Sequence, residues 1–200
     1  MEINISDSEI HEIVHRVVEK TLDMSLSSTK TGPADSSLLD KSQSKHQVVA
    51  IGTDHGGVDL KEVLKAHLSA KDFEIIDCGT HTKESVDYPD IALSVAELVA
   101  TGKAWRGIII DGAGIGSCMA ANKVPGVRAA LCYDYATAVN SREHNNANVL
   151  TLGAGLIGTN LAKLIVDTWL STAFGGGRHA RRVNKITAIE QRFLSDGKVK

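Results

Sequence analysis

The sequence predicts an α/β fold: a Rossmann-like parallel sheet of about five strands with helices on both faces, preceded by an N-terminal amphipathic helix on a flexible linker. From residue 47 onward, short β-branched runs alternate with helical apolar patterns. Strands that alternate with helices form parallel sheets covered on both faces. A change of composition near residue 46 separates this part from the N-terminal segment. We therefore expect a docking helix over 1–22, a linker over 23–46 and one folded domain over 47–200.

Apolar periodicity marks the elements of the domain in order. Runs rich in β-branched residues predict five strands, at Val48–Gly52, Phe73–Asp77, Ile108–Asp111, Val127–Cys132 and Asn148–Leu152. Apolar residues at helical spacing predict the helices between and after them, at Val58–Ser69, Ile91–Thr101, Ser117–Lys123, Tyr135–Arg142, Leu156–Leu170 and Arg178–Phe193. Ligands of such sheets bind at the carboxyl ends of the strands, so we expect the functional site at that edge.

The segment before the domain has a different character. Apolar residues share one face of the helix predicted over 1–22: Ile10, Ile13, Val14, Val17, Val18 and Leu22. Ser6 and Glu9 have the spacing of a capping box, which begins the helix. Residues 23–46 are rich in Ser, Thr, Lys and Asp, a composition typical of a linker. A short helix on such a linker needs a partner for its apolar face: its own domain, a second copy or another protein.

Composition argues against several classes of function. The 200 residues carry a net charge of −2, which leaves no basic surplus for binding nucleic acid. No apolar run approaches the ~20 residues that cross a membrane, and the acidic N-terminus does not predict a secretory signal. The three cysteines, Cys78, Cys118 and Cys132, lack C-x-x-C spacing and fit a reducing cytosol. Neither they nor the scattered histidines predict a metal site.

A glycine turn lies at the centre of the domain. The strand over 108–111 ends on Asp111, and glycines follow at alternate positions, at Gly112, Gly114 and Gly116. A strand that passes through glycines into a helix presents free backbone N–H groups, which form a ready anion site. Two alternatives stay open. The turn can be a plain connection capped by Asp111, or a dinucleotide fingerprint in which Ser117 replaces the third glycine and Asp134 is the ribose-binding acid.

Four polar clusters follow these elements, and we expect them to meet at one edge of the sheet. They are Asp54-His55, Asp111 with its glycine turn, Arg142–Asn145, and the arginines and histidine of Arg178–Arg182. Arginines and a helix N-terminus suit a phosphate, while a carboxylate and a histidine can move protons. Taken alone, the basic helix reads as a solvated face, and His144 as an ordinary helix-end histidine.

From Val48 to about Gln191 the chain resembles the ribose-5-phosphate isomerase type B family, which includes the galactose-6-phosphate isomerase subunits. The stretches that carry the resemblance cover nearly the whole domain in the family's order: Gly52–Gly57, Asp87–Asp90, Gly112–Gly116, Ala120–Arg128, Arg142–Val149 and Gly176–Val183. The resemblance implies isomerisation of a sugar phosphate without metal or cofactor, through a cis-enediol. It also implies a homodimer, or a dimer of dimers, whose active sites combine residues of two subunits.

The resemblance also implies a role for each matching residue. Asp54 and His55 match the family's substrate-binding pair, and Arg178 and Arg182 match its phosphate-binding arginines. His144 matches the residue that opens the sugar ring, and Asn145 its substrate-binding neighbour. Gly112, Gly114 and Gly116 form the turn that would bind the enediolate oxygens through backbone N–H groups.

The chain departs from the family at the catalytic base. Type B isomerases usually carry Cys-Gly-Thr-Gly, where this chain has Asp111 and Ala113. One galactose-6-phosphate isomerase subunit resembles this pattern, with Asp at that place. A carboxylate can perform enediol chemistry, so we expect Asp111 to be the base. Alternatively the base has moved to Cys118, or activity is lost.

We therefore expect a sugar-phosphate isomerase, acting on ribose 5-phosphate and ribulose 5-phosphate. The alternatives are an isomerase of a six-carbon or deoxy sugar phosphate, a catalytically silent sugar-phosphate-binding subunit, and a protein that binds NAD. The segment 1–46 resembles the encapsulation peptides that carry enzymes into bacterial microcompartments. That resemblance implies a location in the bacterial cytoplasm inside a microcompartment, with shell proteins or co-packaged enzymes as partners of residues 1–22.

Overall fold

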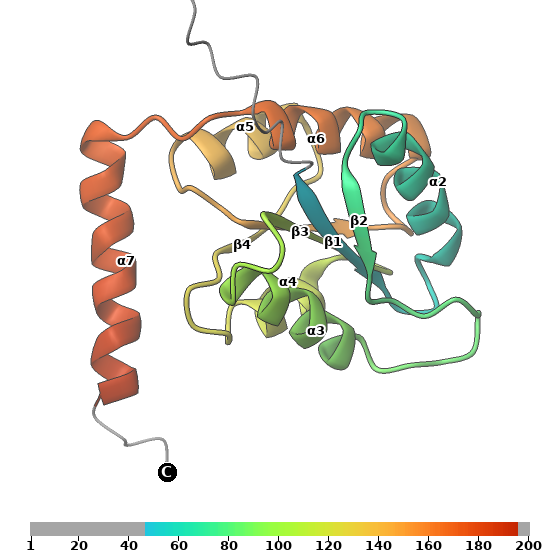
Figure 1. Ribbon diagram of the computed structural model, residues 1–200, viewed down its shortest axis with the longest axis horizontal. Helices are drawn as coiled ribbons and strands as arrows, with labels where there is room; N and C mark the ends of the chain where they lie inside the picture. Colours follow the sequence, from blue (N-terminus) through green and yellow to red (C-terminus); the bar gives the residue numbers. More distant parts are fainter. Residues whose placement is uncertain (1–46, 196–200) are drawn as a thin grey trace, which may run out of the picture. The chain divides into compact units, whose positions relative to one another are not determined.

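The computed structural model describes residues 47–195, and the helix and linker expected over 1–46 lie outside that range. Five strands alternate with helices along this part of the chain (Figure 1). The strands are β1 (Val48–Thr53), β2 (Glu74–Asp77), β3 (Arg106–Asp111), β4 (Ala129–Leu131) and β5 (Val149–Gly153). The helices are α2 (Val58–Ser69), α3 (Tyr88–Ala100), α4 (Ile115–Ala121), α5 (Tyr135–Glu143), α6 (Thr159–Ser171) and α7 (Gly177–Ser195).

The strands form one parallel sheet in the order β2-β1-β3-β5-β4, so the expected fold class is confirmed. Successive residues of β1 and β3 belong to different cores, as the two-residue period of a strand requires. Ile51 and Ile108 pack in the core under α2, α5 and α6, whereas Ala50 and Ile109 pack in the core under α3 and α4. Figure 1 shows α5, α6 and α2 on one side of the sheet and α3 and α4 on the other.

Most boundaries fall within two residues of those expected. Two helix starts differ by three residues: α3 begins at Tyr88 rather than Ile91, and α6 begins at Thr159 rather than Leu156, after its N-cap Gly158. Pro89 lies in the first turn of α3, where the missing N–H costs nothing. Asp134 caps α5 by accepting a hydrogen bond from the Thr137 N–H in a capping box. Helix capping therefore accounts for the carboxylate that follows β4, and a role in binding ribose is not needed to explain it.

Helix α7 is amphipathic, but only Val183 on it is buried. Four large apolar side chains on the same helix are exposed: Ile186, Ile189, Phe193 and Leu194. The helix lies beside β4, the edge strand of the sheet (Figure 1), and the Glu190 carboxylate accepts a hydrogen bond of 3.0 Å from the Gly126 N–H. No helix within residues 47–195 is long and apolar enough to cross a membrane.

Candidate functional site

The loop after β1 lies against the glycine turn at the carboxyl edge of the sheet. The Asp54 N–H donates to the carbonyl oxygen of Ile110 on β3, at 3.3 Å. The Asp54 carboxylate is buried and accepts a hydrogen bond of 2.9 Å from the Gly56 N–H. A Cβ added to Gly56 would lie 3.6 Å from the Gly112 nitrogen, so the two loops are in contact. Exposed His55 accepts a hydrogen bond of 3.4 Å from the Val86 N–H through Nδ1.

Asp111 ends β3 with its carboxylate inside the glycine turn. Oδ1 accepts hydrogen bonds from the N–H groups of Ala113, at 2.8 Å, and Gly114, while Oδ2 accepts one from Ser117 at 3.1 Å. Gly114, with a φ of +75°, provides the left-handed backbone that the turn requires. The carboxylate therefore occupies part of the anion site that the turn forms, as the capping alternative described. The N–H groups of Gly112 and Gly116 are not among its donors.

In this geometry Asp111 can act as a base only through its Oδ2 atom. Each carboxylate oxygen offers about two acceptor positions, so Oδ2 keeps one position free while Oδ1 has none. Cys118, the alternative base, points elsewhere. Its thiol donates to the Ala129 carbonyl oxygen at the start of β4, at 3.5 Å, and its Sγ accepts from the Asn122 side chain at 3.6 Å. Cys118 is half-buried beside β4 rather than within the turn.

Two tyrosines that we had not expected at the site lie against the glycine turn. A Cβ on Gly116 would come within 2.5 Å of the Tyr88 ring, so that ring lies directly on the turn. The Tyr133 hydroxyl group donates to the Ala113 carbonyl oxygen from the end of β4. The sequence contained a signal for both, because each follows a strand and therefore lies at the carboxyl edge.

His144 and Asn145 are joined through Asn140. The Asn145 amide group donates to the Asn140 side-chain oxygen at 3.1 Å, and the Asn140 amide nitrogen lies 2.9 Å from His144 Nδ1. With the Asn140 amide placed this way, Nδ1 is the acceptor and the proton of a neutral His144 is on Nε2. Nε2 lies 3.9 Å from the Glu143 carboxylate.

Arg178 lies in the first turn of α7, and its neighbour His179 contacts His144. The rings of His144 and His179 stack at 4.2 Å between centroids, and the Gly175 N–H donates to the Glu143 carbonyl oxygen at 2.9 Å. Partial desolvation, and then the positive charges of His144, Arg178 and Arg182, lower the pKa of His179. Arg178 and Arg182 are both exposed, so their guanidinium groups are open to a ligand.

Within one chain, the residues around Asp111 and the residues around His144 lie at opposite edges of the sheet. Asp111 pairs with Gly153 at the carboxyl ends of β3 and β5, and Gly107 pairs with Val149 at their amino ends. Helix α5 leaves the carboxyl end of β4 and runs back, so its last residues lie at the amino edge. The Gly107 N–H donates to Asn148 there, at 3.0 Å.

The expectation that all four clusters meet at one edge of a single chain is therefore wrong. The end of a helix that follows a strand in a parallel sheet returns to the opposite edge. We name the residues of each edge as half-sites. The carboxyl half-site is Asp54, His55, Asp111, Gly112, Gly114 and Gly116. The amino half-site is His144, Asn145, Arg178 and Arg182.

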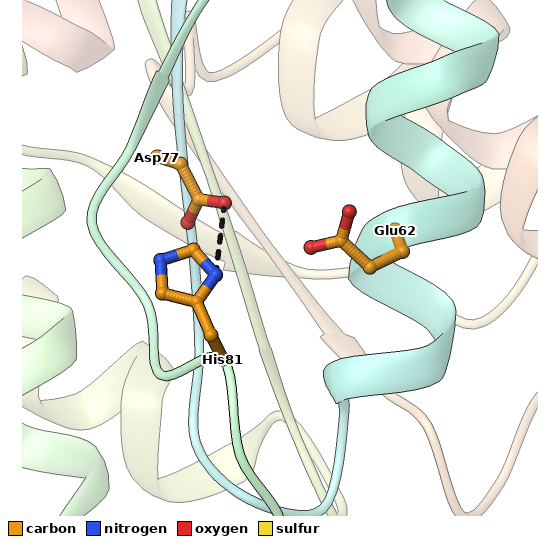
Figure 2. A group of neighbouring side chains, drawn as sticks. All are labelled: Glu62, Asp77 and His81. Carbon is orange, nitrogen blue, oxygen red and sulfur yellow. Dashed lines mark ion pairs between the residues drawn. The ribbon is translucent and has the colours of Figure 1, made fainter.

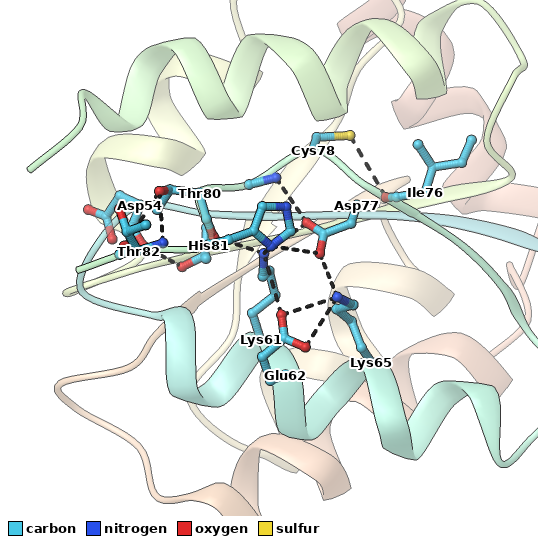
Figure 3. A network of polar contacts seen from close by, with 12 residues as sticks. Asp54, Lys61, Glu62, Lys65, Ile76, Asp77, Cys78, Thr80, His81 and Thr82 are labelled. Carbon is cyan, nitrogen blue, oxygen red and sulfur yellow. Dashed lines mark hydrogen bonds and ion pairs between the residues drawn. The ribbon is translucent and has the colours of Figure 1, made fainter. Parts of the chain in front are cut away.

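A buried lysine supports the carboxyl half-site from below (Figure 3). The Lys61 ammonium group is fully buried and donates to Asp77 Oδ1 and to the Thr80 carbonyl oxygen, each at 2.9 Å. The Thr80 N–H in turn donates to the Thr53 carbonyl oxygen at 3.0 Å, immediately before Asp54. Lys61 thus ties α2 to the loop that follows β2 and fixes the backbone at Thr53.

Glu62, Asp77 and His81 bring a ligand atom each within 4.8 Å of one another (Figure 2). Two ammonium groups already neutralise Asp77: Lys61 at 2.9 Å from Oδ1 and Lys65 at 2.7 Å from Oδ2. A divalent cation would have to displace both lysines, one of which is fully buried. The cluster is therefore an ion-pair network rather than a good metal site.

This network predicts a pH dependence of stability. Burial would raise the pKa of Asp77, but hydrogen bonds from Lys65 and Lys61 hold it below the ordinary value of 3.8. A carboxyl group with a lowered folded-state pKa stabilises above its unfolded-state pKa, and that stability disappears as pH falls. Asp77→Asn should lower the free energy of unfolding by about 2 kcal/mol at pH 7. Its difference from the parent should shrink below about pH 5.

Urea unfolding at several pH values between 3 and 7 measures both effects. Glu74→Gln is the matched control, because Glu74 is an exposed carboxylate on the same strand. A difference between Asp77→Asn and the parent that stays constant across this range would show that the pKa of Asp77 is not lowered by folding.

The fold and the polar groups at its two edges define a class of protein. Carboxylates, an imidazole and a glycine turn at the carboxyl edge, with histidine and arginines at the amino edge, suit proton transfer on a small phosphorylated substrate. Comparison with known proteins agrees. The model of the Ribose/Galactose Isomerase family matches residues 49–186. The chain belongs to this family, and it is an aldose–ketose isomerase of sugar phosphates.

Individual relatives show how far the similarity extends. The chain is 49% identical over 144 residues to ribose-5-phosphate isomerase B of Escherichia coli, covering 72% of this chain and 97% of that protein. It is 43% identical over 143 residues to D-erythrulose-4-phosphate isomerase of Pectobacterium atrosepticum, covering 71% and 94%. A solved structure of Clostridium thermocellum ribose-5-phosphate isomerase B superposes with a TM-score of 0.73 at 53% identity, covering 74% of this chain and 99% of that chain.

Proposed function

We propose that this protein interconverts ribose 5-phosphate and ribulose 5-phosphate, with Asp111 as the base. One observation carries the proposal: a buried carboxylate held in the glycine turn at the carboxyl edge, with one acceptor position of Oδ2 free. The relatives named ribose-5-phosphate isomerase B, at 49% and 53% identity, support the choice of sugar.

The chemistry follows from these groups. Asp111 Oδ2 takes the proton from C2 of the open-chain aldose, and the C2–H electron pair forms the C1–C2 double bond of the cis-enediolate. Negative charge then develops on the former carbonyl oxygen. Asp111 accepts no hydrogen bond from the N–H groups of Gly112 and Gly116, so these two groups can donate to that oxygen. The hydroxyl proton on the C2 oxygen passes to the negatively charged C1 oxygen, so that the charge moves to the C2 oxygen. Asp111 then returns its proton to C1 as the C2 oxygen becomes the carbonyl oxygen, which gives the ketose.

His144 is the group we assign to ring opening. With Nδ1 accepting from Asn140, Nε2 carries the proton that the ring oxygen needs when its bond to C1 breaks, while the C1 hydroxyl proton leaves to solvent as C1 becomes the carbonyl carbon. Arg178 and Arg182 are assigned to the phosphate, for which exposed guanidinium groups at the start of a helix provide paired donors.

These assignments require two copies of the chain. The amino half-site of one copy would complete the carboxyl half-site of the other, and the two-fold symmetry of a dimer would create two such sites. The exposed apolar side chains of α7, such as Ile189 and Phe193, supply a surface that a second copy would bury. We therefore propose a homodimer, or a dimer of dimers, with shared active sites.

A panel of sugar phosphates tests the substrate. We expect the highest kcat/KM with ribose 5-phosphate, because the relatives at highest identity are named for it. The erythrulose-4-phosphate isomerase at 43% identity makes a four-carbon sugar phosphate the necessary comparison, alongside six-carbon and deoxy sugars. A higher kcat/KM for any of these would change the assigned sugar. Binding of ribose 5-phosphate without turnover of any sugar would favour a silent subunit.

We also propose that residues 1–22 dock the enzyme through linker 23–46 into a microcompartment of the bacterial cytoplasm, leaving 47–200 as the isomerase domain. The apolar face of the predicted helix supports this, since the family match begins only at residue 49.

Deletion of residues 1–46 should leave kcat/KM within about twofold of the parent and abolish co-purification with shell proteins. Replacing Val14 and Val17 by Asp in the full chain is the matched control, since it removes the apolar face but keeps the length. Loss of activity on deletion would instead assign the segment to the catalytic fold.

A further inference from the structure

A pocket opens at the amino edge of the sheet, the edge that also carries the amino half-site. It has a volume of about 560 Å³ and lies between the start of β1, the end of α3 and the start of β3. Its polar lining includes Lys103, Arg106, Arg128, Asn146 and Asn148. Arg178 and Arg182 do not line it, so it is distinct from the proposed phosphate site.

The arginines at this pocket form no ion pair with the carboxylates of residues 47–195. Within residues 47–195, no carboxylate oxygen lies within 4.0 Å of Arg106, Arg128 or the buried Arg142 beside them. The described contacts of Arg142 are to backbone and amide oxygens, such as the Asn146 side-chain oxygen at 3.0 Å. Three guanidinium groups therefore share one region without an ion pair, and the Glu190 carboxylate, which raises the pKa of Arg128, acts from beyond ion-pair distance.

Arg106 also has donors without partners. A single hydrogen bond is formed by its side chain within the described range, from Nη1 to the Trp105 carbonyl oxygen at 3.0 Å. Its Nε is buried with no partner. Arg128 uses Nε on the Asn146 carbonyl oxygen at 3.0 Å, and its two terminal nitrogens form no bond within residues 47–195. The unpartnered, buried Nε of Arg106 calls for an acceptor that is not part of residues 47–195.

The electrostatic cost of this arrangement is visible in Arg106. Burial, followed by the positive charges of Arg142 and Arg128, lowers the pKa of Arg106 to about 10. An anion in the pocket would relieve both the desolvation and the mutual repulsion.

We propose that this pocket binds a phosphate group through the guanidinium forks of Arg106 and Arg128, with Lys103 at its mouth. A planar aromatic ligand does not fit the same surface, because Trp105 is flanked by the Arg106 guanidinium group at 4.4 Å and the Phe73 ring at 6.4 Å. The paired donors instead match the oxygens of a tetrahedral dianion. The ligand is therefore inorganic phosphate or a small phosphate ester.

Tryptophan fluorescence reports this pocket directly. The chain has two tryptophans, and the Arg106 guanidinium carbon lies 4.4 Å from the centre of the Trp105 ring and 6.0 Å from that of Trp169. Titration with inorganic phosphate, in the full chain carrying Arg182→Ala, should give a saturable fluorescence change. Arg106→Gln should weaken the apparent Kd about 10- to 100-fold, the loss expected for hydrogen bonds to a charged group. Glycerol phosphate, titrated in parallel, distinguishes an ester from the free ion.

Lys103→Gln provides a second test that folding cannot confound, because Lys103 is exposed at the pocket. It should weaken phosphate binding severalfold, whereas Lys185→Gln, the same charge change on exposed α7, should not. Phosphate should also raise the Tm of the parent more than that of Arg106→Gln. A fluorescence change that does not saturate, or equal affinity in the parent, Arg106→Gln and Lys103→Gln, would overturn the proposal.

Discussion

Asp111→Asn should lower kcat for ribose 5-phosphate by about 10²- to 10⁴-fold, the usual contribution of a positioned base. The substitution keeps the shape of the side chain and one acceptor oxygen, but it removes the electron pair that would take the proton from C2. KM should change far less, since the phosphate is assigned to Arg178 and Arg182. Coupled assay of ribulose 5-phosphate formation measures kcat and KM separately.

Two further variants distinguish the role of Asp111 as the base from its structural role at the start of α4. Asp111 also caps α4 by accepting backbone hydrogen bonds, so Asp111→Asn should lower the Tm by a few degrees, and its kcat must be measured well below that temperature. Asp111→Cys introduces the residue that type B isomerases usually carry and should retain measurable turnover. Cys118→Ala should leave kcat near the parent value. Turnover that survives Asp111→Asn but disappears in Cys118→Ala would move the base to Cys118.

Mixing two inactive variants should restore activity. In a dimer with shared sites, Asp111→Asn damages the carboxyl half-site and Arg182→Ala damages the amino half-site. A heterodimer of the two then has one site with both defects and one site with none. Random exchange of subunits at equal concentrations makes half of the dimers heterodimers, so about one quarter of the sites become intact. We therefore expect recovery of about one quarter of the parental rate per subunit, measured at a substrate concentration below the parental KM and after incubation to allow exchange.

The control for the mixing experiment uses variants of the same half-site. Asp111→Asn mixed with Asp54→Ala should recover nothing, because both changes lie at the carboxyl edge and every site keeps at least one defect. No recovery in the first pair would place all the functional residues in one copy of the chain, whereas recovery in the control pair would place Asp54 and Asp111 in different sites.

The fold could be predicted from local pattern because this sheet is buried on both faces. Continuous apolar runs such as Ile108–Ile110 mark its strands, and glycines or capping carboxylates mark its turns. Gly114 and Asp134 lie where the pattern required them. Helix boundaries were less certain, as at Tyr88, because the residues around a helix start carry weak apolar signal.

The site was harder to predict than the fold. The polar residues after β1 and β3 were placed at the carboxyl edge correctly, since strand direction alone decides that. His144 and Arg178 were expected there too, although a helix of nine residues carries its C-terminus back to the amino edge. The engagement of Asp111 with the N–H groups of its own turn depends on side-chain geometry, which no spacing reveals. Sequence spacing also does not reveal that arginines gather at one pocket, because Arg106 and Arg142 are far apart in sequence.

The separation of the half-sites has a kinetic consequence. If neither edge of a single chain holds a whole site, specific activity follows mass action and depends on the enzyme's own concentration. Dilution below the dissociation constant of the dimer would silence every copy, even though each remains folded. Confinement of many copies in a small volume would have the opposite effect, so the place where the chain accumulates would also be the place where it is switched on.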